Sequence, residues 1–199
     1  SFPNLLNISR RNTQRQDYDK QESEEHKSSA PVKQNEQEQK QSLFTGAEDF
    51  VKSLEPMVKK AASLLGIPSP VIIAQAALET GWGQKIIKND KGQSSHNLFN
   101  IKADSRWQGE KVAKNTLEFE QGSMVTKKEN FRVYDTIADS VDDYASFLTS
   151  NARYSDALNT GGNVEQFLQG LQQAGYATDP NYASKIGSIV NKVAGLLVK

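Results

Sequence analysis

Residues 71–83 read VIIAQAALETGWG, and this stretch decides the fold. Its first eight residues are apolar nearly all round, which predicts a buried central helix rather than one on the surface. Ser69 and Pro70 are expected to supply the N-cap and the first helical position. Gly81 and Gly83 are expected to end the helix. The chain is therefore predicted to pack around one buried helix that ends in a glycine-rich turn.

A second helix is predicted before it, from Thr45 to about Leu65, because apolar residues recur there at helical spacing. Thr45 and Glu48 have the form of a capping box. Pro56 falls inside the pattern, so we expect a kink or two abutting helices near it. Gly66 is expected to stop this element.

Residues 111–134 predict a β-hairpin. Leu117 and Phe119 alternate with Glu118 and Glu120, and a turn is expected at residues 121–123. If the apolar face packs on the helices, the glutamates face outward, toward whatever lies between the hairpin and the helical lobe. Helices are predicted again from Ile137, around residues 154–158, from residue 163 and from residue 179. The predicted fold class is α+β, mostly helical with one β-hairpin lobe.

The chain divides into two parts by composition. Residues 1–44 are rich in Gln, Glu, Lys and Ser, which predicts a disordered or extended linker. Residues 45–199 are predicted to form one folded domain.

Composition excludes several classes of function. Lys+Arg and Asp+Glu are both 24, so the net charge is zero, which argues against nucleic acid as a partner. No cysteine is present, and His26 and His96 are far apart, so no metal site is expected. No organic cofactor is implied either. No apolar run approaches the ~20 residues that span a bilayer, so no membrane partner is expected. No signal peptide opens the chain, and an export signal is expected to lie elsewhere.

Glu79 is the foremost candidate for catalysis. It is the only charged residue between Lys60 and Lys85. A carboxylate at the C-terminal end of a helix faces the negative pole of the helix dipole, and apolar neighbours such as Trp82 desolvate it. Both effects raise the pKa of Glu79 and keep a proton available near neutral pH, as a general acid for glycoside cleavage requires. The alternative is a glutamate simply exposed at a helix end.

Glycoside hydrolysis usually needs a second carboxylate across the sugar ring. Glu118 and Glu120 lie on one face of the predicted hairpin, and the pattern alone does not choose between them or exclude two ordinary solvated side chains. Four aspartates at the start of the next helix are interpreted as capping that helix: Asp135, Asp139, Asp142 and Asp143.

Aromatic side chains stack on sugar rings, and several of them lie near loops or element ends: Trp82, Phe99, Trp107, Tyr134 and Tyr176. Phe50, Phe147 and Phe167 lie in mid-helix and are expected in the core. Asn97 is a candidate to bind an acetamido group, although a turn-capping role explains it equally well.

Four ordered blocks together resemble the family 73 glycoside hydrolases, and in particular the hydrolase domain of flagellar peptidoglycan hydrolases. The blocks are IAQAALETGWG at 73–83, NLFNIK at 97–102, FRVY at 131–134 with SVDDY at 140–144, and AGYATDPNYA at 174–183. The resemblance covers about Phe50 to Val193. It implies a lysozyme-like fold with the hairpin lobe beside the substrate cleft.

The resemblance also implies an activity, endo-β-N-acetylglucosaminidase, which cuts the peptidoglycan glycan strand after N-acetylglucosamine. By motif match, Glu79 corresponds to the proton donor, Glu118 to the second glutamate and Tyr176 to an active-site tyrosine. Trp82, Asn97, Phe99 and Tyr134 are then the candidate substrate-binding residues. Whether configuration at the sugar is retained or inverted stays open, as does a route assisted by the acetamido group.

Two departures from the family pattern stand out. Asn100 occupies a position where the family commonly has glycine, and Asn tolerates a left-handed backbone better than most residues, so the turn can survive. A rod-binding domain that precedes the hydrolase in many flagellar relatives is missing from this chain, so flagellar rod proteins are expected partners only through such a domain.

The resemblance therefore implies a periplasmic enzyme that opens the cell wall for the flagellar rod. The alternatives are a muramidase or lytic transglycosylase, and a non-catalytic wall-binding assembly module.

Overall fold

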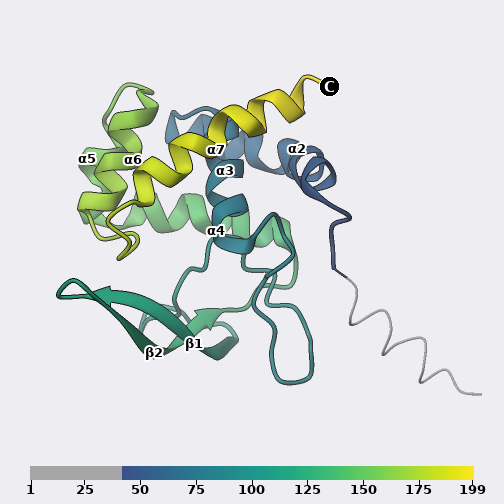
Figure 1. Cartoon of the computed structure of the whole chain (residues 1–199), viewed down its shortest axis with the longest axis vertical. Helices are drawn as coiled ribbons and strands as arrows, with labels where there is room; N and C mark the ends of the chain where they lie inside the picture. The colour runs from purple at the N-terminus through teal and green to yellow at the C-terminus, as the bar shows by residue number, and fades with distance from the viewer. Residues whose placement is uncertain (1–41) are drawn as a thin grey trace, which may run out of the picture.

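The structure is a computed structural model that describes residues 42–199. Its elements are α2 (Ala47–Leu65), α3 (Ser69–Thr80), β1 (Lys111–Glu120), β2 (Ser123–Arg132), α4 (Ile137–Ser150), the 3₁₀ turn η1 (Ala152–Tyr154), α5 (Ser155–Leu158), α6 (Val164–Gln173) and α7 (Tyr182–Leu197). The helices gather on one side, and the antiparallel hairpin β1–β2 projects from the other (Figure 1). The predicted α+β class with one hairpin lobe is confirmed.

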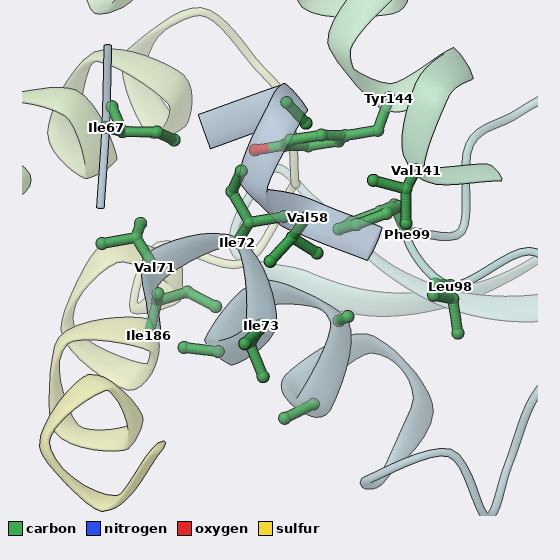
Figure 2. Close-up of a cluster of buried hydrophobic side chains, with 14 of the residues drawn as sticks. Val58, Ile67, Val71, Ile72, Ile73, Leu98, Phe99, Val141, Tyr144 and Ile186 are labelled. Carbon is green, nitrogen blue, oxygen red and sulfur yellow. The ribbon is translucent and has the colours of Figure 1, made fainter. Parts of the chain in front are cut away.

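Helix α3 forms the centre of the helical lobe, as its sequence predicts. Every residue from Val71 to Ala77 is at most 1% exposed. The helix packs against α2 on one side and α7 on the other, and Ile72 and Ile73 lie in the cluster that joins them (Figure 2). Gly81 ends it in the left-handed conformation, with φ of 55°. Because the whole helix is buried, the residues at and after its last turn are held in a fixed position.

The predicted starts of the first two helices are wrong in detail. Gly46, not Thr45, is the N-cap of α2, and no side chain caps it. The carboxylate of Asp49 instead accepts a hydrogen bond from the main-chain N–H of Thr45. Helix α3 begins at Ser69, with Pro68 as its N-cap. In neither place does a side-chain hydroxyl cap the first turn.

Helix α2 runs through Pro56 as one element rather than two abutting helices. Just before it, Phe44 is only 4% exposed and packs edge-on against Phe50, so the folded part includes at least this residue of the predicted linker. A Cβ at Gly83 would lie 2.3 Å from the Phe44 ring, so this close approach requires glycine. The expectations for residues 1–41 lie outside the described residues.

The hairpin pairs ten residues of each strand, from Lys111 opposite Arg132 to Glu120 opposite Ser123. Leu117 does not pack on the helices, contrary to that expectation, whereas Glu118 faces the space between the hairpin and the helical lobe, as expected. Leu117 is 68% exposed, whereas the Glu118 side chain is only 12% exposed. The inner face of the hairpin is polar because it borders a cleft rather than the hydrophobic core.

The base of the hairpin is tied to α4 by a buried guanidinium. Arg132 donates to Asp143 at 2.9 Å and to the main-chain oxygen of Lys102 at 3.1 Å. The hydroxyl of Tyr134 also donates to Asp143. Asp143 therefore anchors the hairpin rather than capping α4, which is a correction to the sequence interpretation. The cap is Thr136, which accepts from the N–H of Asp139.

Within residues 42–199, no helix taken singly has both the length and the apolar character needed to cross a bilayer; α2 and α3 meet that requirement only as a pair, and they are bent by 116° at their junction.

Candidate active site

A cleft of about 710 Å³ lies between the helical lobe and the hairpin. Helix α3 contributes Glu79 at its end, and strand β1 contributes Glu118. The loop over residues 99–104 and the loop before α7, which carries Tyr176, add to the lining. The structure thus brings together all three residues predicted to be catalytic.

Glu79 occupies the last turn of α3, where its carboxyl is held by one neighbour. Asn100 Nδ2 donates to Glu79 Oε2 and to the main-chain oxygen of Glu79, both at 2.9 Å. Burial raises the pKa of Glu79 to about 7, while the hydrogen bond from Asn100 acts in the opposite direction. The raised pKa predicted from the sequence is confirmed, and burial is its main cause. A large fraction of Glu79 is thus protonated at neutral pH.

Glu118 lies across the cleft on β1 and is ion-paired with Lys102. Lys102 Nζ is also 3.7 Å from Glu129 Oε1 on β2. The cleft therefore combines one buried carboxyl group that retains a proton with a second that is paired to a cation.

Tyr176 closes the helical side of the cleft. Its hydroxyl donates to the main-chain oxygen of Phe99 at 3.4 Å, and its ring contacts those of Tyr144 and Tyr182. Burial raises the pKa of Tyr176 well above its ordinary value, so it stays a neutral donor. Phe99 is 2% exposed and stacks on Tyr144 at 4.1 Å between ring centroids (Figure 2).

A buried hydrogen-bond network supports α3 one turn before Glu79. Gln75 is fully buried, donates to the hydroxyl of Tyr182 at 3.2 Å and accepts from the hydroxyl of Tyr144. These bonds satisfy the amide where an unpaired polar group would be costly. They tie α3 to α4 and α7 directly beneath the cleft.

Three of the predicted substrate-binding residues do not line the cleft. Asn97 is fully buried, and its amide bonds the main chain of residues 99, 101 and 132, which is the turn-capping alternative. Trp82 packs against Phe50 and Lys192. Tyr134 is 6% exposed and borders a smaller cavity of about 270 Å³ beside His96.

Two other aromatic residues, Trp107 and Phe147, lie in places that differ from the sequence interpretation. Trp107 packs against Tyr134 and lies under the guanidinium of Arg132, away from the cleft lining. Phe147 was expected in the core but is only half-buried, and it lines the cleft together with Tyr154. Helical periodicity places a residue on a face, but it does not show which face borders a cleft.

Neither Lys102 nor Arg153 was a candidate site residue from the sequence, and both line the cleft. Asn100 was noted only as a departure from the family pattern. It adopts φ of 50°, so the expectation that Asn keeps the left-handed turn is confirmed. In residues 42–199, no group of three His, Asp or Glu side chains is placed to hold a metal ion.

The comparison with known families decides the assignment. Residues 55–195 match the glucosaminidase family model, described as mannosyl-glycoprotein endo-beta-N-acetylglucosaminidase. The chain belongs to the glucosaminidase family. This family is a family of glycoside hydrolases, so the chain is assigned to that class of enzyme. The family and the fold agree with those implied by the four sequence blocks.

Among curated relatives, the chain is 53% identical over 143 residues to the peptidoglycan hydrolase FlgJ of Vibrio cholerae, matching 72% of the chain and 42% of the relative. It thus spans less than half the length of that relative. The peptidoglycan hydrolase FlgJ of Salmonella typhimurium is 40% identical, with 79% of this chain and 49% of the relative covered.

Solved structures agree with this assignment. A peptidoglycan hydrolase mutant from Sphingomonas sp. A1 superposes with a TM-score of 0.72 at 41% identity, covering 76% of the present chain and 99% of that chain. The glycoside hydrolase domain of Salmonella typhimurium FlgJ superposes with a TM-score of 0.61 at 37% identity, covering 77% and 92%. The lysozyme-like arrangement expected from the sequence is therefore shared with hydrolase domains.

Proposed function

We propose that this chain is a peptidoglycan hydrolase with endo-β-N-acetylglucosaminidase activity, cutting the glycan strand after N-acetylglucosamine. The observation that carries the proposal is the carboxyl group of Glu79, whose pKa is about 7, in a cleft with Glu118 across from it. A general acid is most effective when its pKa lies near the working pH. The names of the relatives support peptidoglycan as the substrate.

In this proposal Glu79 gives its proton to the glycosidic oxygen as the bond from that oxygen to the anomeric carbon breaks. The leaving sugar departs as a neutral alcohol, and positive charge develops on the sugar ring. Glu118, on the opposite wall, stabilises that charge or takes the proton of the attacking water. The water oxygen then bonds to the anomeric carbon, and the cleavage is balanced by one water molecule.

Tyr176 and Phe99 are proposed to hold the substrate beside Glu79. Tyr176 and Phe99 both line the cleft. Asn97 and Tyr134 are proposed to act indirectly, since each bonds an element that borders the cleft. Trp82 is proposed to act indirectly as well, by packing the turn after α3 against Phe50. Of these, Asn97 bonds the loop that presents Phe99 and Asn100.

The wider role is proposed by resemblance. Flagellar peptidoglycan hydrolases open the wall for the rod, and we infer the same role and a periplasmic site of action for this chain. Contact with rod proteins would involve a region outside residues 42–199. Glycan strands are the partner that the cleft itself would bind.

Product analysis tests the proposed activity. Purified peptidoglycan digested with the protein, and then reduced with borohydride, should yield fragments that end in N-acetylglucosaminitol by mass spectrometry. N-acetylmuramitol ends would identify a muramidase, and anhydro ends a lytic transglycosylase. Sedimentation with peptidoglycan without release of soluble fragments would identify a wall-binding module. The matched control is Glu79→Gln, which should bind but release nothing.

A further inference from the structure

One side-chain amide holds the carboxyl group of Glu79. Asn100 Nδ2 donates one hydrogen bond to Oε2 and one to the main-chain oxygen of Glu79, each 2.9 Å long. Two bonds from a single nitrogen to two parts of the same residue fix the carboxyl relative to the end of α3. A reacting group that is held in this way spends less of its time in unproductive orientations.

The orientation of the amide is set by the main chain. A carbonyl oxygen can only accept, so the NH₂ side of Asn100 has to face Glu79 O. Turning the amide round would bring two acceptors, Asn100 Oδ1 and Glu79 O, together. In the orientation present, Oδ1 is buried and has no hydrogen-bond partner in the described residues, a cost that the two bonds to Glu79 offset. Oε2 therefore faces a donor in both protonation states of Glu79.

This makes the two carboxyl oxygens unequal. An oxygen that faces an N–H group serves best as the acceptor, so the proton of the neutral acid belongs on the other oxygen, Oε1. Within residues 42–199, Oε1 has no hydrogen-bond partner, and it is not among the atoms sealed from solvent. Glu79 lines the cleft, where a glycosidic oxygen would lie.

We propose that Asn100 is a positioning residue for Glu79, which fixes the carboxyl group and confines the transferable proton to Oε1. The proposal rests on the proposed function, in which Glu79 is the general acid. Asn100 has a left-handed backbone, with φ of 50°. In this proposal, that conformation presents the amide to the end of α3.

Other titratable groups lie around Glu79, but within the described residues its carboxyl is hydrogen-bonded by Asn100. They are Tyr144 of α4, Tyr176 before α7, Tyr182 of α7, and, along the cleft, the Lys102–Glu118 pair with Asp104, Lys114 and Arg153. Burial raises the pKa of the three phenols, so they stay neutral through the physiological range. None of these groups donates a hydrogen bond to the Glu79 carboxyl among the described residues.

The test is Asn100→Gly, because glycine adopts the left-handed backbone without strain and the fold is expected to survive. Carboxyl-carbon NMR of the free protein should show the pKa of Glu79 rising by about one unit, since a hydrogen bond to the charged form is lost. With peptidoglycan, kcat should fall about tenfold while KM changes less than about twofold. The matched control is Gln121→Gly, at another left-handed residue, φ 49°, in the hairpin turn.

An unchanged pKa and an unchanged kcat in Asn100→Gly would overturn the proposal. So would a raised pKa with unchanged kcat, because the orientation of the proton would then not matter. Equal losses in the control would trace the effect to glycine itself and also overturn it. The titration needs no substrate. If the wild type released no glycan fragments, the proposed function would fail, and the NMR result would still report whether Asn100 controls Glu79.

Discussion

Glu79→Gln should lower kcat for peptidoglycan hydrolysis by at least about 10³-fold, the upper part of the range for loss of a general acid. Glutamine keeps the size of the side chain, and its amide oxygen can still accept from Asn100, so the cleft should keep its shape. It has no proton to give to a glycosidic oxygen. Release of soluble fragments and binding to insoluble peptidoglycan are the two measurements, and binding should stay within about threefold.

Glu118→Gln is the comparison variant for this result. It removes the second carboxylate and its pairing with Lys102 but leaves the acid in place, so a smaller loss, about 10²-fold, is expected. Glu79→Gln with wild-type kcat would contradict the assignment of the acid. A full loss in Glu79→Gln with no loss in Glu118→Gln would instead favour a route in which the acetamido group of the substrate replaces the second carboxylate.

Glu79→Gln should also change how the free energy of unfolding depends on pH. The folded-state pKa of Glu79, about 7, lies above its ordinary value of 4.5, so the folded protein binds more protons than the unfolded chain between these limits. The contribution of the neutral carboxyl is fully present below about pH 4.5 and is lost as pH rises through 7. Between pH 5 and 8, the free energy of unfolding of the wild type should fall relative to that of Glu79→Gln by about 2 kcal/mol.

Urea denaturation of both proteins at pH 5 and pH 8 measures this difference. Glu48→Gln is the control, since the pKa of Glu48 is lowered by Lys52 and its carboxylate stays charged at both pH values. The control should show no relative change. Parallel pH dependence in the wild type and Glu79→Gln would mean that Glu79 is not the buried acid the structure describes.

The sequence predicted those features that depend on local pattern. The apolar run 71–78 gave the central helix, and the alternation after Lys111 gave the hairpin, because each rests on a period of one element. The raised pKa of Glu79 followed from its place at the end of a buried helix. These inferences needed no knowledge of distant residues.

Contacts between distant segments were beyond such reasoning. The bond from Asn100 to Glu79 joins residues 21 apart, and Arg132 reaches Asp143 across the hairpin base. Nothing in the local pattern of either pair reports the other partner. The exposure of Leu117 was not predicted for the same reason. Alternation defines the two faces of a strand, but it does not show which of them borders a cleft.

The central claim, that Glu79 carries a proton at neutral pH, is tested most directly by NMR titration of its carboxyl carbon in the wild-type protein, with Glu79→Gln used to assign the signal. The account predicts a midpoint at about pH 7. A midpoint at the ordinary value of 4.5 would contradict it, because the side chain would then be a carboxylate with no proton to donate at neutral pH.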